Sequence, residues 1–180
     1  MGIILAKSAG FCFGVQRAVD TAYKEAGKQH VYTYGPIIHN EEVIKDLRKK
    51  GVLVIEDLAE LDQQEDETVI IRSHGVSKDV MEQLEARHVN VVDATCPFVK
   101  KIHTIVQDES QKGNRIIIVG NKDHPEVEGI IGWCETKSYT VQSVSEAENL
   151  MKNIENEPDF EHINFSLVSQ TTFNKNKFKD

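Results

Sequence analysis

Short apolar runs alternate with helix-period segments along almost the whole chain. The apolar runs predict strands at 2–6, 31–35, 52–56, 68–72, 89–93, 115–120, 138–142 and 163–169. The segments between them predict helices at 13–26, 41–50, 77–88, 97–112 and 145–154, and a short helix following "HPEVEG". Continuous Val/Ile strands separated by helices are typical of parallel sheets covered on both faces, so the pattern predicts an α/β fold.

The expected helix boundaries agree with this division. Asn40 is suited to cap the helix at 41–50, and Gly51 to end it. Pro97 is suited to the first position of the next long helix, and Gly113 follows its end. The first helix has an apolar face with helical spacing, formed by Val15, Ala18, Val19, Ala22, Tyr23 and Ala26.

The two halves of the sequence resemble each other. "GFCFGVQRAV" is similar to "ATCPFVKKIH", and their cysteines are 96 − 12 = 84 residues apart. "HNEEVI" is similar to "HPEVEGI", with histidines 124 − 39 = 85 residues apart. Two pairs at nearly one spacing indicate duplicated units. We therefore predict two similar small α/β domains with mostly parallel sheets, at 1–96 and 97–180.

Composition narrows the class of function. The 180 residues carry 21 basic and 29 acidic side chains, a formal charge of −8, which argues against nucleic acid or an anionic membrane as partner. No segment approaches the roughly 20 apolar residues that span a bilayer, and the first residues do not resemble a secretory signal. Three widely spaced cysteines favour a reduced, cytoplasmic protein whose thiols are available for chemistry or metal.

The unusual polar residues all fall just after a predicted strand and near the start of a predicted helix. At this edge of a parallel sheet, helix N-termini offer unpaired N–H groups and ligands bind. The residues concerned are Cys12, His39, His74, Cys96, His124, Glu126, Gln170, Thr171 and Thr172.

Cys12 and Cys96 are the strongest candidates among them. A lone cysteine is usually a small buried hydrophobic residue, and we interpret Cys134 in that way. Cys12 and Cys96 instead precede helices in matching contexts, and a helix N-terminus favours thiolate, which attacks electrophiles or binds metal. No C-x-x-C or H-x₃-H spacing supports zinc, and two thiolates suit an iron–sulfur cluster equally well.

The histidines and Glu126 have two interpretations each. Histidines 39, 74 and 124 are each compatible with a turn residue, while together they predict a pocket for an anion such as phosphate. Glu126 is a candidate proton donor two residues after His124, or a first-turn glutamate that stabilises the helix dipole.

Taken together, the motifs resemble those of the 4-hydroxy-3-methylbut-2-enyl diphosphate reductases, the LytB/IspH family. The matching stretches are "GFCFGVQRAV", "HNEEV", "SHGVS", "DATCPFVKKIH", "HPEVEGIIG" and "SQTTF". The resemblance implies reductive removal of an allylic hydroxyl in the methylerythritol phosphate route to isoprenoids. The products would be isopentenyl and dimethylallyl diphosphate, and an external one-electron donor such as ferredoxin or flavodoxin would supply the electrons.

The resemblance also implies roles for residues. The family holds a [4Fe-4S] cluster on three cysteines, with one iron open to the substrate hydroxyl. By position, Cys12 and Cys96 would be two of these ligands. Glu126 would be the proton donor, with Thr171 beside the substrate hydroxyl as a relay. The diphosphate contacts would be His39, His74 and His124.

One departure from the family pattern limits these expectations. The family has a third α/β domain with a third cysteine ligand, and "NKNKFKD" closes this sequence before either. We therefore expect the first two units of a three-domain pseudo-symmetric enzyme, which alone binds a cluster poorly and turns over little. A non-catalytic apo fragment and a hydrolytic zinc site built from Cys12, Cys96 and a histidine are the alternatives.

Overall fold

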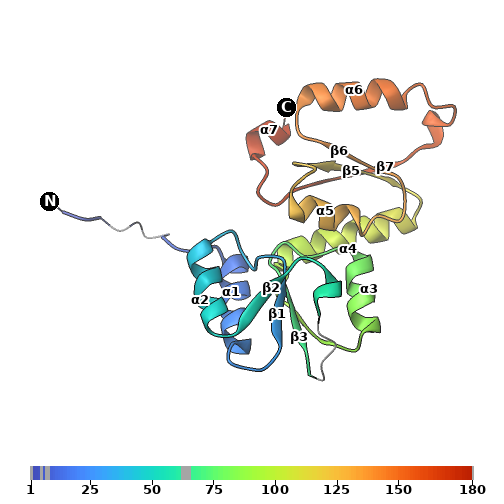
Figure 1. Cartoon of the computed structure of the whole chain (residues 1–180). Helices are drawn as coiled ribbons and strands as arrows, with labels where there is room; N and C mark the ends of the chain where they lie inside the picture. Colours follow the sequence, from blue (N-terminus) through green and yellow to red (C-terminus); the bar gives the residue numbers. More distant parts are fainter. Residues whose placement is uncertain (1, 5, 7–8, 62–65, 180) are drawn as a thin grey trace. The chain divides into compact units, whose positions relative to one another are not determined.

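The computed structural model describes residues 2–4, 6, 9–61 and 66–179 (Figure 1). By its internal packing the chain forms two compact units. The first unit comprises 1–73 and 88–96, and the second comprises 74–87 and 97–180. Residues 74–87 thus belong to the second unit, whereas the sequence analysis placed them in the first domain. The domain boundary at residue 96 stays a prediction.

The first unit is built on a parallel sheet of four short strands, in the order β2-β1-β3-β4. The strands are β1 (Val31–Tyr34), β2 (Val52–Ile55), β3 (Thr68–Ile71) and β4 (Asn90–Asp93). The helices are α1 (Phe13–Glu25), α2 (Glu41–Lys49) and the short 3₁₀ turn η1 (Leu58–Glu60). Because all four strands are parallel, their carboxyl ends lie along one edge of this sheet.

The core of the first unit joins α1 and α2 to the sheet. The apolar face predicted for the first helix is buried or half-buried, with Ala18 and Ala22 fully inaccessible. These small side chains let α1 pack closely on the sheet beside Leu47 of α2. The cluster includes Val31, Val52 and Ile70 from three neighbouring strands.

The strand predicted at 2–6 is wrong for the residues that the structure describes there. Gly2, Ile3, Ile4 and Ala6 are in no strand, and Ile3 and Ile4 are 98% and 95% exposed. Leu5 lies outside the described residues. An apolar run becomes a strand only where a neighbouring strand takes up its backbone N–H and C=O groups. Cys12 therefore does not follow the end of a strand among the described residues.

The second unit contains a smaller parallel sheet, in the order β6-β5-β7. The strands are β5 (Arg115–Val119), β6 (Ser138–Val141) and β7 (Phe165–Ser169). The helices are α3 (Lys78–Ala86), α4 (Pro97–Gln111), α5 (Pro125–Ile131), α6 (Val144–Ile154), α7 (Lys175–Lys179) and the short 3₁₀ turn η2 (Phe160–His162). In each sheet, the strand that comes first in the chain lies between the next two: β1 lies between β2 and β3, and β5 lies between β6 and β7.

The core of the second unit packs α4 and α5 against the central strand. Ile116 and Ile118 of β5 are inaccessible, as are Val106 of α4 and Val127 of α5. Alternate residues of β5 thus face this core, which fixes where the strand ends and where the following loop begins. Among the described residues, no helix is long and apolar enough to cross a membrane.

The caps predicted from the sequence are confirmed, and one helix starts earlier than predicted. The side chain of Asn40 accepts hydrogen bonds from the second and third amides of α2, and Gly51 has φ +89° after its end. The short helix expected after "HPEVEG" instead begins within this stretch, at Pro125, with His124 as N-cap. Pro125 is favourable at N1, where no backbone N–H is required. Glu126 therefore lies inside the first turn of α5.

Candidate functional site

Cys12 and Cys96 both belong to the first unit. Cys12 is the exposed N-cap of α1, with φ −67° and ψ 164°, and its thiol makes no capping hydrogen bond. Cys96 is half-buried, follows the end of β4, and donates its backbone N–H to the carbonyl of Ser73 at 2.9 Å. The sulfur of Cys12 is thus not used for the helix cap, the ordinary task of a side chain at that position.

The first turns of α1 pack directly against Cys96. A Cβ atom at Gly14 would overlap the Cys96 sulfur, so any other residue there would displace that sulfur. Arg17, one turn further along α1, donates hydrogen bonds to the carbonyls of Thr95 at 3.0 Å and Asp93 at 3.2 Å. Both contacts place Cys96 against the N-terminal part of α1, the helix that Cys12 caps.

This pair of cysteines suits an iron–sulfur cluster as two of its ligands. Both are free thiols in the same unit, one cradled against a glycine that leaves room for its sulfur. Unpaired backbone N–H groups at the start of α1 stabilise negative charge near Cys12. Thiolates are the ligands such clusters use.

Cys134 does not match this ligand chemistry. It packs against the core of the second unit, and its sulfur donates to the carbonyl of Ile130 at 3.4 Å. Burial raises the pKa of the Cys134 thiol to about 11, although a hydrogen bond with Ser138 acts in the opposite direction. At neutral pH the residue is a protonated, half-buried side chain, in line with its interpretation as structural.

Alkylation of the metal-free chain should separate these thiols. At pH 8 we expect iodoacetamide to modify the exposed Cys12 rapidly and Cys134 slowly, because the pKa of about 11 leaves little Cys134 thiolate. Mass spectrometry of timed digests measures both rates, and denaturation should equalise them. Equal rates in the folded chain would contradict the assigned environment of Cys134.

Glu126 and Thr171 come together at the carboxyl edge of the second sheet. Glu126 is 2% exposed. Its Oε1 accepts the backbone N–H of Thr171 at 2.6 Å, and its Oε2 accepts the Thr171 hydroxyl at 2.9 Å. The two residues follow β5 and β7, which are neighbours in the sheet, so parallel pairing brings their loops into contact. A buried carboxyl joined to a hydroxyl can move a proton to or from a bound molecule.

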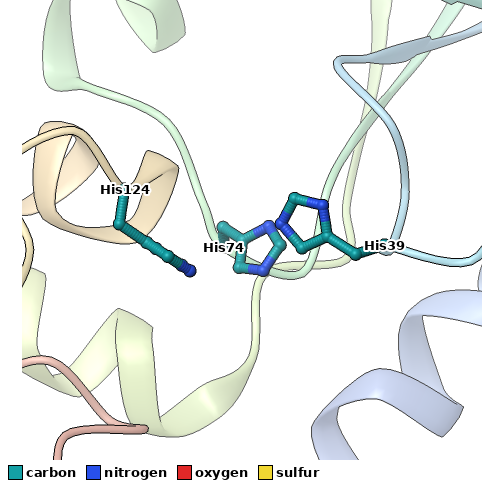
Figure 2. Close-up of side chains that lie close together, drawn as sticks. All are labelled: His39, His74 and His124. Atoms are coloured by element: carbon teal, nitrogen blue, oxygen red, sulfur yellow. The ribbon is translucent and has the colours of Figure 1, made fainter.

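His124 and His74 lie beside this pair in the second unit. The Nδ1 of His124 accepts the backbone N–H of Glu126 at 3.1 Å. A neutral His124 ring therefore carries its proton on Nε2, the form that donates to an anionic oxygen. The rings of His74 and His124 meet edge to face with centroids 5.3 Å apart (Figure 2). His74 comes from the loop before α3, and His124 from the loop before α5.

His39 belongs to the first unit. It lies in the loop after β1, is exposed, and stands directly before Asn40, the N-cap of α2. Buried Ile37 and Ile38 fix the backbone before it, with the carbonyl of Ile37 accepting from Ser73. Its place at the carboxyl end of a parallel strand matches that of His124 in the second unit.

Two residues that shape the surroundings of Cys96 were not singled out from the sequence. Gly14 and Arg17 lie inside the "GFCFGVQRAV" motif, where a glycine in a helix and an arginine beside an apolar face were the available signals. The surroundings of Glu126 also depend on Gln170, which the sequence analysis did single out and whose side chain accepts from the Asn121 amide at 3.2 Å and donates to Thr172 at 3.0 Å. This buried amide ties the loops after β5 and β7 together.

Comparison with known proteins gives one consistent result. A family model described as "LytB protein" matches residues 3–180. A curated 4-hydroxy-3-methylbut-2-enyl diphosphate reductase of Caldanaerobacter subterraneus subsp. tengcongensis is 50% identical over all of this chain and 60% of its own length. The corresponding protein of Clostridioides difficile is 39% identical over 97% of this chain. The chain thus spans about 60% of the length of these relatives.

Solved structures agree with this match. A structure of (E)-4-hydroxy-3-methyl-but-2-enyl diphosphate reductase, titled as the terminal enzyme of the non-mevalonate pathway, superimposes with a TM-score of 0.78 at 37% identity. It covers 98% of this chain and 60% of its own. The E-1-hydroxy-2-methyl-but-2-enyl-4-diphosphate reductase from Plasmodium falciparum gives 0.85 at 31% identity, over 96% and 52%. The predicted α/β class is confirmed, and the chain belongs to the LytB protein family.

Proposed function

We propose that this chain is the N-terminal part of an enzyme that removes the allylic hydroxyl of 4-hydroxy-3-methylbut-2-enyl diphosphate by reduction. Two electrons and two protons enter, the C–O bond breaks, one proton leaves with the oxygen as water, and the other is added to carbon. The products are isopentenyl and dimethylallyl diphosphate. The observation that carries the proposal is the buried Glu126 held through both oxygens by Thr171, next to His124.

Glu126 is the proposed proton donor. Thr171 orients its carboxyl and relays the proton to the departing hydroxyl, which leaves more easily as water than as hydroxide. The proposal is supported by the burial of Glu126, since water cannot compete with a bound substrate for the proton there. Both oxygens of the carboxyl are held in fixed directions, so the acid is positioned before the substrate arrives.

The proposed diphosphate contacts are the three histidines. Imidazole N–H groups donate to phosphate oxygens, and His74 and His124 already lie edge to face in the second unit. His39 is assigned from its position before a helix N-terminus in the first unit. Holding the anionic end fixes the allylic end of a five-carbon substrate relative to the proton donor.

Cys12 and Cys96 are the proposed cluster ligands in this chain. A [4Fe-4S] cluster, when bound, supplies the electrons and a Lewis-acidic iron for the hydroxyl. The third ligand would come from the part of the relatives that this chain does not span. An external one-electron donor such as ferredoxin or flavodoxin would reduce the cluster, and the cytoplasm would be its compartment.

Metal analysis tests the proposal. The chain is compared with an extended protein, in which the C-terminal remainder of the Caldanaerobacter relative follows residue 180. We expect the extended protein, purified anaerobically, to bind iron and sulfide, absorb broadly in the visible and reduce the substrate. We expect the 180-residue chain to bind much less. Stoichiometric zinc without iron would favour the hydrolytic alternative, and neither metal in the extended protein would leave the apo alternative.

A further inference from the structure

We infer that Trp133 is a positioning residue that holds the loop carrying His74 on the second unit. The loop and the helix after it, residues 74–87, follow β3 in the chain but belong to the second unit. Some contact within that unit must therefore fix the loop next to His124. The inference rests on the proposed function only for what His74 binds.

The indole of Trp133 provides that contact. Its Nε1 donates to the carbonyl of Val76 at 2.8 Å, and Val76 is 6% exposed. The ring stacks on the buried ring of His103 in α4, with centroids 5.4 Å apart and planes at 18°. Stacking on His103 restricts the indole ring of Trp133. The hydrogen bond from its N–H to Val76 therefore costs little additional side-chain entropy.

The backbone of the loop lies directly against the end of α5. A Cβ atom at Gly132 would overlap Ser77, and one at Gly129 would lie 3.7 Å from the carbonyl oxygen of His74. His124 caps the start of this same helix. One short helix therefore carries His124 at its start, and Trp133 just beyond its end anchors the loop of His74.

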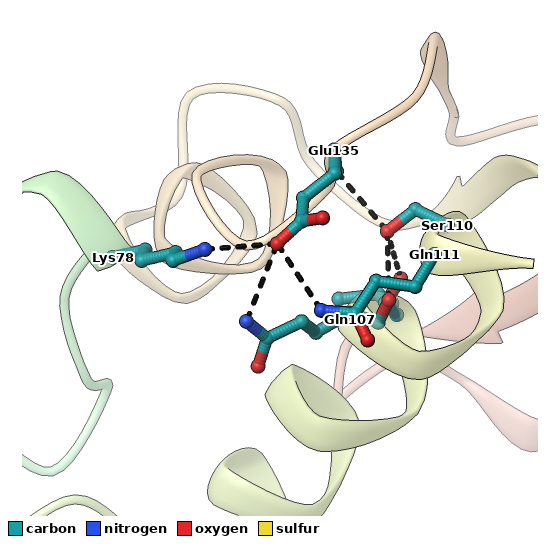
Figure 3. Close-up of polar contacts among 6 residues, drawn as sticks. Lys78, Gln107, Ser110, Gln111 and Glu135 are labelled. Carbon is teal, nitrogen blue, oxygen red and sulfur yellow. Dashed lines mark hydrogen bonds and ion pairs between the residues drawn. The ribbon is translucent and has the colours of Figure 1, made fainter.

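A second, weaker anchor follows the loop. Lys78, the first residue of α3, pairs with Glu135 at 2.8 Å (Figure 3). Glu135 also accepts from Gln107 and Gln111 of α4, each at 3.4 Å. Lys78 lowers the pKa of Glu135 most, followed by Gln111 and Gln107. Because both partners are more than one third exposed, water and salt screen this pair, and Trp133 contributes more.

Loss of the indole N–H should free the loop. Trp133→Phe keeps a ring to stack on His103, but it removes the hydrogen bond to Val76 together with part of the indole that packs on the core. His74 then no longer keeps its place at His124, whereas the Glu126–Thr171 pair is untouched. The matched control is Tyr139→Phe, which removes an aromatic hydroxyl that accepts from Arg115 in the same unit.

The experiment measures inorganic pyrophosphate binding and amide hydrogen exchange in the 180-residue chain. For Trp133→Phe we expect about tenfold weaker binding and faster exchange confined to residues 75–80. Tyr139→Phe should match the wild type. In a His74→Ala background, Trp133→Phe should weaken binding no further, which separates positioning from a general loss of stability.

The results test the role of Trp133 separately from the assignment of the histidines as diphosphate contacts. Wild-type exchange and affinity in Trp133→Phe, or an equal loss in the His74→Ala background, would overturn the role of Trp133. If the wild-type chain binds no pyrophosphate, the histidine assignment fails, and exchange at 75–80 alone decides the anchor. Should Trp133→Phe not fold, Lys78→Met must produce a smaller loss confined to the same segment, and wild-type behaviour there would count against the anchor.

Discussion

Replacing Glu126 with glutamine should lower turnover of the extended protein at least about 100-fold, because general acid catalysis contributes on the order of 10²–10⁴-fold. The amide keeps the shape of the site. Its oxygen accepts the Thr171 N–H as the carboxylate does, and its NH₂ group donates to the Thr171 hydroxyl. Only the proton is lost. Turnover with a chemical reductant, measured alongside the visible absorption of the cluster, checks this expectation.

The matched control is Glu128→Gln, on the same helix and two residues further along. Glu128 is exposed, whereas Glu126 is 2% exposed. The control should keep wild-type turnover, and both variants should keep wild-type iron and sulfide. Wild-type turnover in Glu126→Gln would exclude this residue as the proton donor. A loss of cluster in that variant would point to a structural role instead.

The second large effect is expected at Gly14. In most helices, alanine in place of glycine stabilises the helix by about 1 kcal/mol. At Gly14 the added Cβ would overlap the Cys96 sulfur, so the sulfur must rotate away from its place against α1. Contacts that orient a metal ligand typically change metal affinity about 10- to 100-fold. We therefore expect Gly14→Ala to lower cluster affinity at least about tenfold, with little change in thermal stability.

Gly129→Ala is the control for this prediction. It makes the same change in another helix, where the added Cβ would have no neighbour nearer than 3.5 Å. Iron and sulfide per chain, measured in the extended protein against a competing chelator, report cluster affinity, and thermal melts of the metal-free proteins report stability. Equal cluster affinity in both variants would show that the sulfur of Cys96 does not need this contact.

Local order was largely predictable from the sequence, since it depends on neighbouring residues. The cap at Asn40 and the end at Gly51 follow from short-range hydrogen bonding and backbone freedom. The meeting of Glu126 with Thr171 also has a sequence signal, because each follows a strand of the same parallel sheet. The exception is the run at 2–6, where apolar character predicts a strand but cannot reveal whether a partner strand exists.

Contacts between distant segments were not predictable. Nothing near Trp133 in the sequence refers to Val76, 57 residues earlier, and the assignment of 74–87 to the second unit depends on such contacts. Arg17 likewise reaches carbonyls 76 and 78 residues away. In both cases a side chain donates to a backbone carbonyl, and every residue offers that acceptor, so residue identity carries no information about the partner.

The chain passes from one unit to the other three times, at residues 73–74, 87–88 and 96–97. This affects the order of events during synthesis on a ribosome. When residue 96 has emerged, all four strands of the first sheet are available, but Trp133 and Glu135 have not yet emerged. The His74 loop and α3 must wait for them. Vectorial folding, which is usual for successive domains, therefore requires the first unit to fold while residues 74–87, between β3 and β4, are still undocked.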